Sequence, residues 1–297
     1  MTQNLILAIR AAIHAGKEIL KIYDLPEIEV EKKNDNSPLT KADMNANRVI
    51  NKYLWETGHP IISEENKQLD FSERKNWATC WMVDPLDGTK EFIKRTGEFT
   101  VNIAFCDKGR PILGVIYVPV SRKLYFADVA EGKAYKKVLD HGHDLPTDER
   151  GMQAELFAED NRIYPNMEAR KEASQKESIH KDGFLEDSPK QNILRVVGSR
   201  SHMNKETSQF IDASKAKYET VEIISRGSSL KFCLVAEGEA DVYPRFAPTM
   251  EWDTAAGHAI CSAVGLQVIA QDTQKELVYN KENLLNPHFL VGTSARS

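Results

Sequence analysis

The stretch WMVDPLDGTKEF, from Trp81 to Phe92, ends a short apolar run with two carboxylates, Asp84 and Asp87, only three residues apart. A proline lies between them, and Gly88 and Thr89 follow directly. Two like charges this close repel each other, and the pKa of one carboxyl group rises unless a positive charge keeps both ionised. The stretch therefore predicts a strand that ends in a tight turn and presents both acids to a positively charged partner.

The first 140 residues are predicted to form two helices followed by a multi-stranded, mostly antiparallel sheet. Apolar residues recur at helical spacing between positions 5 and 23, and a second helix is predicted from about Thr40 onward. Strand patterns follow in the runs HPIISEEN, CWMVDPLDG, EFTVNIAFC, PILGVIYVP and KLYFADV. In EFTVNIAFC the alternation is regular and places every second residue from Phe99 to Phe105 on one face.

Residues 141–190 differ from the segments on either side. They are rich in Asp, Glu, Lys and Ser with scattered apolar residues, which predicts a polar insertion or linker. His141 and His143 are interpreted as solvated loop histidines, with metal binding as the alternative. Residues 191–297 then alternate helix and strand patterns, as a layered α/β domain does. We therefore expect an N-terminal α+β half (1–140), the insertion and a C-terminal α/β half.

The overall composition is that of an ordinary globular protein, with 41% hydrophobic and 28% charged residues among 297. The net charge of −5 argues against a nucleic-acid-binding protein, which usually has a basic balance. No window approaches the ~18 apolar residues of a membrane span, and the N-terminus lacks the features of a signal peptide. We expect a cytoplasmic protein without an integral membrane segment; peripheral association with the inner membrane and the oligomeric state stay open.

The four cysteines do not form a C-x-x-C pair and are expected to be buried free thiols in a reducing compartment. They are Cys80, Cys106, Cys233 and Cys261.

Further acidic residues lie where other predicted elements end or begin. Glu64 and Glu65 close an apolar run, and Asp253 precedes a predicted helix. Each has an ordinary explanation when taken singly: a solvated strand end, an N-cap, or a turn at Asp87-Gly88. Taken together, these hard oxygen ligands suit Mg²⁺, and two such ions about 3.5–4 Å apart would neutralise the crowded acids. Our interpretation of the positive partner is a pair of Mg²⁺ ions.

The turn between the two aspartates offers further groups to a metal and a phosphate. Pro85 fixes the turn, and the carbonyl of Leu86 can then point inward as a ligand. Gly88 and Thr89 are predicted to start a helix whose free N–H groups can receive a phosphate.

The motifs DPLDGTKEF, SEEN and EWDTAAGHA together resemble the inositol monophosphatase superfamily of Mg²⁺-dependent, lithium-sensitive phosphatases. NSPLTKAD, GSSLKFCLVAEGEADVYPRF and WDTAAGHA resemble one branch of it, the CysQ-type 3'(2'),5'-bisphosphate nucleotidases. The resemblance covers nearly the whole chain except residues 141–190. It implies an αβαβα layered sandwich of the inositol monophosphatase and fructose-1,6-bisphosphatase type, with the active site between the two halves.

The resemblance also implies roles for the acidic residues. Glu64, Asp84 and the Leu86 carbonyl would hold a first Mg²⁺, and Asp84, Asp87 and Asp253 a second, so that the N-terminal half carries most of the ligands. A third, weaker ion near Glu64 is usual in the family. The expected catalytic residues are Asp43, Thr89 and Glu64, of which Thr89 and Asp43 would orient the attacking water.

Substrate contacts implied by the resemblance come from both halves. The expected set is Glu64, Leu86, Asp87, Gly88, Thr89, His202, Ser228, Lys231, Arg245 and Asp253. Of these, Lys231 and Arg245 suit a second phosphate.

The expected reaction is hydrolysis of the 3'-phosphate of 3'-phosphoadenosine 5'-phosphate to AMP and phosphate by in-line attack of a metal-activated water, in the setting of sulfur assimilation. Two alternatives stay open. One is an inositol monophosphatase or fructose-1,6-bisphosphatase with the same metals. The other is a non-catalytic sensor of nucleotide or metal, which need not keep the water-orienting pair.

Overall fold

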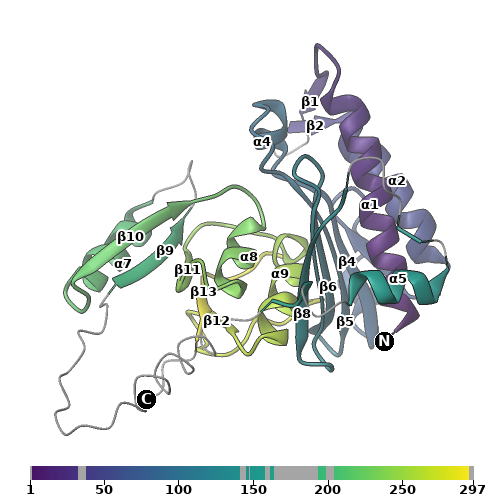
Figure 1. Ribbon diagram of the computed structural model, residues 1–297. Coiled ribbons are helices and arrows are strands. Elements are labelled where there is room, and N and C mark those ends of the chain that lie inside the picture. Colours follow the sequence, from purple (N-terminus) through teal and green to yellow (C-terminus); the bar gives the residue numbers. More distant parts are fainter. Residues whose placement is uncertain are drawn as a thin grey trace, which may run out of the picture.

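The computed structural model of the protein describes residues 2–32, 38–140, 145–146, 148–157, 161–163, 193–198 and 204–293. Within these residues the chain forms five layers in the order helices, sheet, helices, sheet, helix (Figure 1). The predicted αβαβα sandwich is confirmed. The helices of the three helical layers are α1 (Gln3–Tyr23) and α2 (Lys41–Trp55), then α8 (Leu230–Ala236) and α9 (Glu251–Ala263), then α7 (Lys205–Lys215).

The six-stranded sheet lies between the first two helical layers. Its strand order is β3-β4-β5-β6-β7-β8, and every neighbouring pair is antiparallel except β3 with β4. The mostly antiparallel sheet predicted for the first half is thus present. Its strands are β3 (Ile61–Ser63), β4 (Thr79–Asp87), β5 (Thr100–Asp107), β6 (Arg110–Val118), β7 (Lys123–Asp128) and β8 (Lys133–Val138).

Strand β5 is buried on both faces. The predicted face from Phe99 to Phe105 packs in the core beneath α1 and α2. On the opposite face, Ala104 and Cys106 belong to the core formed with α8 and α9. Thr100 and Asn102 share that second face and are fully buried, although both are polar. Because buried polar groups need hydrogen-bond partners, Thr100 and Asn102 must be paired with polar groups of the elements that pack on this face.

The five-stranded sheet has the order β10-β9-β11-β13-β12 and separates α8 and α9 from α7. Strands β10, β9 and β11 are parallel, whereas β13 is antiparallel to both β11 and β12. The alternation of helix and strand predicted for the second half is present in these elements. The strands are β9 (Ile193–Gly198), β10 (Thr220–Ser225), β11 (Val242–Arg245), β12 (Gln267–Ala270) and β13 (Phe289–Gly292).

The smaller elements are the hairpin of β1 (Val30–Lys32) and β2 (Pro38–Thr40), and the short helices α3 (Phe71–Arg74), α4 (Thr89–Ile93) and α5 (Glu149–Leu156). Helix α5 lies in the segment 141–190, and its Met152 and Leu156 are fully buried in the first core. This part of the segment is packed against the N-terminal half. The three-part division of the chain stays a prediction, and His141 and His143 lie outside the described residues.

The four cysteines are buried free thiols, as predicted. No helix among the described residues has the length and apolar character that a membrane crossing requires.

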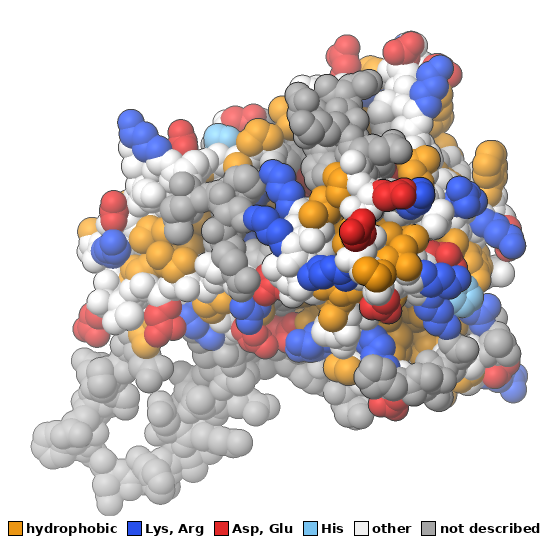
Figure 2. All heavy atoms as spheres, turned by 90° about the horizontal axis from the view of Figure 1, so that it is seen from above, with side chains coloured by type: hydrophobic (Ala, Val, Ile, Leu, Met, Phe, Trp, Pro, Cys, Tyr) orange, Lys and Arg blue, Asp and Glu red, His pale blue; other side chains and the backbone are white. Residues whose placement is uncertain are grey.

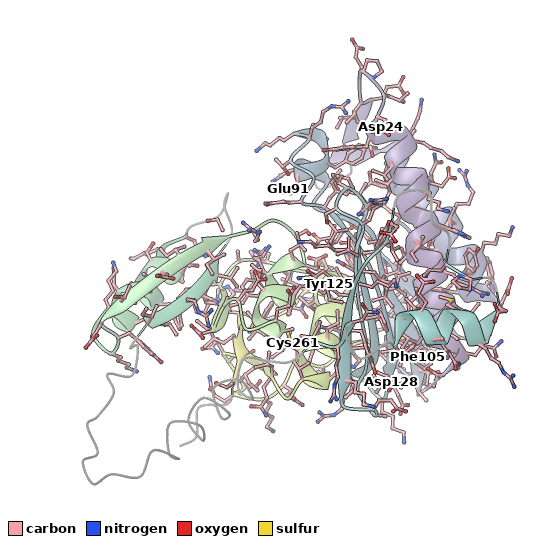
Figure 3. All side chains as sticks on the ribbon, viewed as in Figure 1. Asp24, Glu91, Phe105, Tyr125, Asp128 and Cys261 are labelled. Carbon is pink, nitrogen blue, oxygen red and sulfur yellow. The ribbon has the colours of Figure 1, made fainter. Side chains whose placement is uncertain are left out.

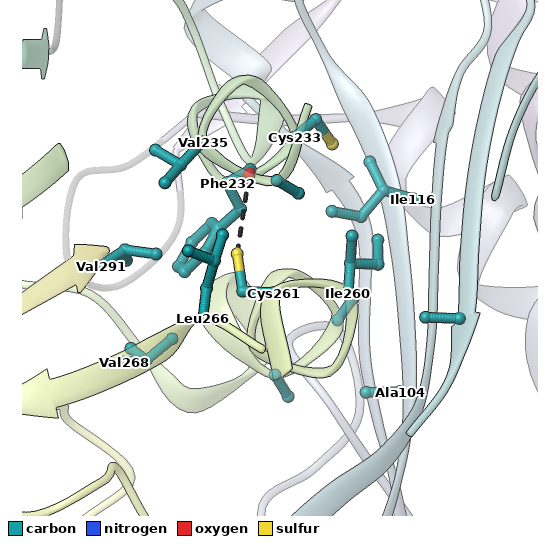
Figure 4. Packing of buried hydrophobic residues seen from close by; sticks show 14 of the residues in the cluster. Ala104, Ile116, Phe232, Cys233, Val235, Ile260, Cys261, Leu266, Val268 and Val291 are labelled. Carbon is teal, nitrogen blue, oxygen red and sulfur yellow. Dashed lines mark hydrogen bonds between the residues drawn. The ribbon is translucent and has the colours of Figure 1, made fainter. Parts of the chain in front are cut away.

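Helix α9 approaches both of its neighbours closely. A Cβ atom added to Gly114 of β6 would lie 2.5 Å from the carbonyl oxygen of Ala256 in α9, and one added to Gly257 would lie 2.3 Å from the ring of Phe232 in α8. Figure 4 shows the resulting contact, in which Cys261 of α9 points at the backbone of Phe232. Glycine thus brings α9 directly against the sheet and α8, and α9 carries Asp253 near its beginning.

We predict that Gly257→Ala lowers the free energy of unfolding by about 1–3 kcal/mol or more, because the new methyl group overlaps a ring that is itself buried. Urea denaturation followed by far-ultraviolet circular dichroism measures this. Gly198→Ala is the matched control, since no atom of the described residues lies within 4 Å of its added Cβ, and it should change stability by less than about 0.5 kcal/mol. Equal effects of the two variants would contradict the close packing of α9.

Candidate active site

The two aspartates of the opening motif lie at the end of β4. The pairing of β4 with β5 is regular up to Asp84 and shifts between Asp84 and Asp87, so the strand bulges where the turn begins. Asp84 is 1% exposed, and its Oδ1 accepts a hydrogen bond from the backbone N–H of Leu86 at 3.0 Å. The turn therefore holds Asp84 inward.

Glu64 reaches the same end of the sheet because β3 runs parallel to β4. Its backbone N–H donates to the carbonyl of Val83 at 3.1 Å, which continues the β3–β4 pairing one residue past the strand. The charge of Glu64 raises the pKa of Asp84, so the two carboxyl groups lie close together. Parallel neighbours thus bring together two acids that are twenty residues apart in the sequence.

Asp253 comes to these acids from the C-terminal half. It lies in the first turn of α9, where its Oδ2 accepts from the backbone N–H of Met250 at 2.9 Å in a capping box. Its pKa is raised from 3.8 to about 8, chiefly by burial and also by the charges of Asp87 and Glu64, while the Met250 N–H and Arg245 act in the opposite direction. Met250 is the N-cap of α9 and Asp253 is the third residue of the helix, so the N-cap role considered for Asp253 is wrong, whereas its proximity to the other acids is observed.

The pKa of Asp84 is raised as well. Burial raises the pKa of its carboxyl group well above the ordinary value, and Glu64, Asp87 and Asp253 add to the rise. Four carboxylates from three separate segments thus repel one another in one place, and full ionisation requires a compensating positive charge.

The donor set matches a hard divalent cation in its chemistry: carboxylate oxygens with a backbone carbonyl beside them. Among the described residues, however, no three or more His, Cys, Asp or Glu side chains are already arranged to hold a metal ion. Binding would therefore require the carboxylates to turn toward a common centre. The carboxylates repel one another, as the raised pKa values of Asp84 and Asp253 indicate, and this repulsion keeps them from a common centre in the protein alone.

Asp43 and Thr89 lie together although 46 positions separate them. The Oδ2 of Asp43 accepts from the N–H of Thr40 at 2.8 Å and from its hydroxyl at 2.6 Å, closing the capping box of α2. The other oxygen, Oδ1, accepts from the Thr89 hydroxyl at 3.3 Å. Asp43 is 2% exposed. The aspartate is thus fixed by its own helix and directs Oδ1 toward Thr89.

Thr89 begins α4, as predicted, and Gly88 before it has φ 89°, a left-handed conformation that favours glycine. A Cβ on Gly88 would lie 3.2 Å from the Cβ of Ser228, so the turn and the loop before α8 are neighbours. This contact joins the metal-ligand candidates to the nucleotide-contact candidates.

Two of the predicted nucleotide contacts, Lys231 and Arg245, lie close enough to influence each other's charge. The Lys231 ammonium donates to the carbonyl of Ser228 at 2.5 Å, lies over the ring of Tyr243 and is 5% exposed. Burial lowers its pKa to about 8, opposed by the charge of Asp87. Arg245 is half-buried and donates to the carbonyl of Pro248.

The Nε atom of Arg245 is buried and has no hydrogen-bond partner among the described residues. His202 lies outside the described residues, so the structure neither places it in the site nor removes it.

A network of amides that sequence reasoning missed lies behind Glu64. Ser63, fully buried, donates to Asn47 Oδ1 at 2.8 Å, and Asn47 donates to Asn66 Oδ1 at 2.9 Å. Asn51 closes the network by exchanging hydrogen bonds with Asn66. The turn that contains Glu64 is thereby tied to α2. The signal in the sequence was weak, since Asn at helix positions 47 and 51 usually faces solvent.

The face seen from above in Figure 2, at the α4 end of the molecule, carries Lys and Arg side chains interspersed with Asp and Glu. Figure 3 gives the orientation: Glu91 of α4 lies at this end of the six-stranded sheet, and Asp128 at the opposite end.

The model of the inositol monophosphatase family matches residues 1–293. The chain belongs to the inositol monophosphatase family. The 3'(2'),5'-bisphosphate nucleotidase CysQ of Escherichia coli strain K12 is 42% identical over 285 residues, which are 94% of this chain and 96% of that protein. The Salmonella typhimurium protein of the same name is 41% identical with the same coverage.

Solved structures of the family agree with this assignment. CysQ from Bacteroides thetaiotaomicron is 46% identical, has a TM-score of 0.81 and is covered over 98% of its chain and 99% of this one. Inositol monophosphatase-II from Staphylococcus aureus, at 20% identity and a TM-score of 0.67 over 99% of this chain and 92% of its own, shows the fold alone. The family resemblance and its CysQ branch, predicted from the motifs, are confirmed. Phosphatases of this family are generally metal-dependent, typically on Mg²⁺. The roles of individual residues stay predictions.

We predict that the metal-free protein loses stability as the pH rises from about 5 to 8. The folded state raises the pKa values of Asp84 and Asp253, the latter from 3.8 to about 8. In this window the folded state therefore binds more protons than the unfolded state, and stability falls with pH. Melting temperatures in EDTA across the window measure the effect.

Asp84→Asn should flatten this pH dependence and raise the melting temperature at pH 8, because it removes one of the repelling charges. Asp128→Asn makes the same change at a buried aspartate at the opposite end of the sheet (Figure 3) and should leave the slope as in the native protein. A native slope in Asp84→Asn would contradict the assignment of the repulsion to this cluster.

Proposed function

We propose that the chain is a Mg²⁺-dependent 3'(2'),5'-bisphosphate nucleotidase that converts 3'-phosphoadenosine 5'-phosphate to AMP and phosphate. The observation that carries the proposal is the convergence of Glu64, Asp84 and Asp253 on one end of the sheet, beside the Thr89–Asp43 pair. The names of the relatives at 41–46% identity over nearly the whole chain support the choice of substrate class.

The proposed metal ligands divide into two sets that share Asp84. Glu64, Asp84 and the Leu86 carbonyl would hold one ion, and Asp84, Asp87 and Asp253 the other, with a third, weaker ion near Glu64. When bound, Mg²⁺ supplies positive charge that neutralises phosphate oxygens and lowers the pKa of water.

Thr89 and Asp43 are proposed to orient the attacking water. The Thr89 hydroxyl lies 3.3 Å from Asp43 Oδ1 and 3.4 Å from the Leu86 carbonyl, and a carboxylate is the stronger acceptor. With its proton directed to Asp43, the hydroxyl can accept a hydrogen bond from a water molecule. Asp43 cannot turn away easily, since both Thr40 donors hold its other oxygen. A non-catalytic sensor of nucleotide or metal would have no use for this pair, which disfavours that alternative.

The second phosphate of the substrate is proposed to bind at Lys231 and Arg245, with Ser228 and His202 as further contacts. Arg245 is the more accessible of the two cations and has an unpaired buried Nε among the described residues. Lys231 must leave the Ser228 carbonyl to reach a ligand. Both cations belong to the C-terminal half, and the charges of Asp87 and Asp253 act on Lys231, so this cation lies beside the acids.

The proposal is tested by phosphate release from a panel of substrates with and without Mg²⁺. The panel contains 3'-phosphoadenosine 5'-phosphate, 3'-phosphoadenylyl sulfate, 3'-AMP, inositol 1-phosphate and fructose 1,6-bisphosphate. We expect the highest kcat/KM for the first, with the sulfated relative as a second substrate. Preference for either sugar phosphate would select the alternative phosphatases of the family, and no release from any substrate would select the sensor.

We predict that Asp84→Asn lowers kcat by more than about 100-fold at saturating Mg²⁺ while the protein stays folded. The loss should exceed the 10–100-fold typical for residues that merely support a metal ligand, because Asp84 is shared by both proposed sites. Steady-state phosphate release measures it, with Asp128→Asn as the control that should keep native activity. Substantial residual activity in Asp84→Asn would overturn the two-ion arrangement.

We predict that Arg245→Ala and Lys231→Ala each raise KM for 3'-phosphoadenosine 5'-phosphate by about tenfold or more and leave 3'-AMP unaffected. A charge-assisted hydrogen bond contributes about 1.5–3 kcal/mol, and 3'-AMP lacks the phosphate that would accept it. Lys215→Ala, at an exposed position on α7, is the control. Equal losses on both substrates would assign Lys231 to support of the Ser228 loop, and no loss on either would place the second phosphate elsewhere.

A further inference from the structure

A chain of buried hydrogen bonds runs from β5 to the acidic cluster. The Thr100 hydroxyl donates to Asn102 Oδ1 at 3.0 Å, and Asn102 Nδ2 donates to Ser229 Oγ at 2.8 Å. The Ser229 hydroxyl in turn lies 2.8 Å from Asp87 Oδ2. Thr100 and Asn102 are fully buried and Ser229 is 2% exposed. Thr100 and Asn102 are the buried polar residues of β5 described above, and Ser229 lies opposite them, directly before α8.

The direction of the chain follows from its chemistry. An amide N–H only donates, so Ser229 Oγ must accept from Asn102 and has a single proton left to give. Two acceptors lie within reach, Asp87 Oδ2 at 2.8 Å and the Asp253 carbonyl at 3.0 Å. A carboxylate accepts more strongly than a neutral carbonyl. Ser229 therefore donates chiefly to Asp87, and Asn102 adds a weaker contact of 3.4 Å to the same oxygen.

The members of this chain come from both halves of the molecule. Asp87 and Asn102 belong to β4 and β5, whereas Ser229 immediately precedes α8 and also touches the backbone of Asp253 in α9. Ser228, with φ 42°, places its hydroxyl 3.1 Å from Thr100 and its carbonyl on Lys231. One network thus holds an acidic side chain of the N-terminal half against the start of α8.

We propose that Asn102 and Ser229 are positioning residues that hold Asp87 Oδ2 and thereby leave Oδ1 to face the metal. The inference rests on the proposed function in one respect, the use of Asp87 as a metal ligand. Because Ser229 lies between Ser228 and the first residue of α8, and Ser228 itself contacts Thr100, the orientation of Asp87 is linked to the residues proposed to bind the nucleotide.

A purely structural role predicts a different result. A buried hydroxyl that only satisfies its neighbours would affect stability when removed and leave the Mg²⁺ requirement unchanged. A positioning role weakens Mg²⁺ binding, since loss of a group that orients a ligand typically reduces metal affinity by 10–100-fold. Mg²⁺ affinity therefore separates the two roles.

The experiment compares Ser229→Ala, Asn102→Ala and the double variant by isothermal titration of the folded, metal-free proteins with Mg²⁺. Ser214→Ala is the matched control, because it removes the hydroxyl of another buried serine, 7% exposed and bonded to the Phe210 carbonyl on α7. We expect Ser229→Ala to raise the Kd for Mg²⁺ by about tenfold or more and the control to stay near the native value. The Kd of the double variant for Mg²⁺ should be no higher than that of the single variant with the higher Kd, since either change breaks the same chain of hydrogen bonds.

Native Mg²⁺ affinity in Ser229→Ala would overturn the proposal, as would additive effects in the double variant. If Asn102→Ala does not fold, the comparison of Mg²⁺ affinity between Ser229→Ala and Ser214→Ala is sufficient to test the proposal. Absence of Mg²⁺ binding by the native protein would also overturn it, because Asp87 would then have no metal to face. Phosphate release is assayed in parallel: a native protein that binds Mg²⁺ but hydrolyses no nucleotide refutes the proposed function and leaves the affinity comparison valid.

Discussion

The mutual repulsion of Glu64, Asp84, Asp87 and Asp253 is the constraint on which the rest of the structure depends. Burial raises the pKa values of Asp84 and Asp253, and each neighbouring carboxylate raises them further. The surrounding fold must therefore hold these groups together against their own charge. It does so with a parallel strand pair, a bulged turn and a helix that packs closely on its neighbours at Gly114 and Gly257. Stability given up at such a site is a recognised companion of function.

Much of the fold and of the site could be predicted because the relevant signals are local. The alternation in EFTVNIAFC, the turn chemistry of DPLDGT and the acid at the start of α9 each reflect the conformation of a few neighbouring residues. The grouping of Glu64 with Asp84 was inferred from their common place at the ends of apolar runs, whereas the pairing of Asp43 with Thr89 needed the family resemblance, since nothing local relates positions so far apart. The structure supplies the physical link in the form of the β3–β4 pairing and the contact between α2 and α4.

Two features were not predicted, because the burial of the residues concerned depends on segments that are distant in the sequence. Asn102 reads as the polar face of a half-buried strand, and only the docking of α8 turns that face into a buried one. In the sequence, Met152 and Leu156 are scattered apolar residues in a polar segment, yet in the structure they belong to the core beneath α1 and α2. In both cases composition indicates solvent, and tertiary packing overrides it.

Two positive charges, Lys231 and Arg245, interact electrostatically with the acidic cluster. In the protein alone, Asp87 and Asp253 stabilise the charged form of buried Lys231, and Arg245 stabilises the charged form of Asp253. These cations therefore offset part of the repulsion before any ligand arrives. Under the proposed function, Mg²⁺ would take over that task for the acids, and the cations would become free to hold a second phosphate. Metal and bisphosphorylated substrate would then favour each other's binding, because each relieves the charge that the other leaves unbalanced.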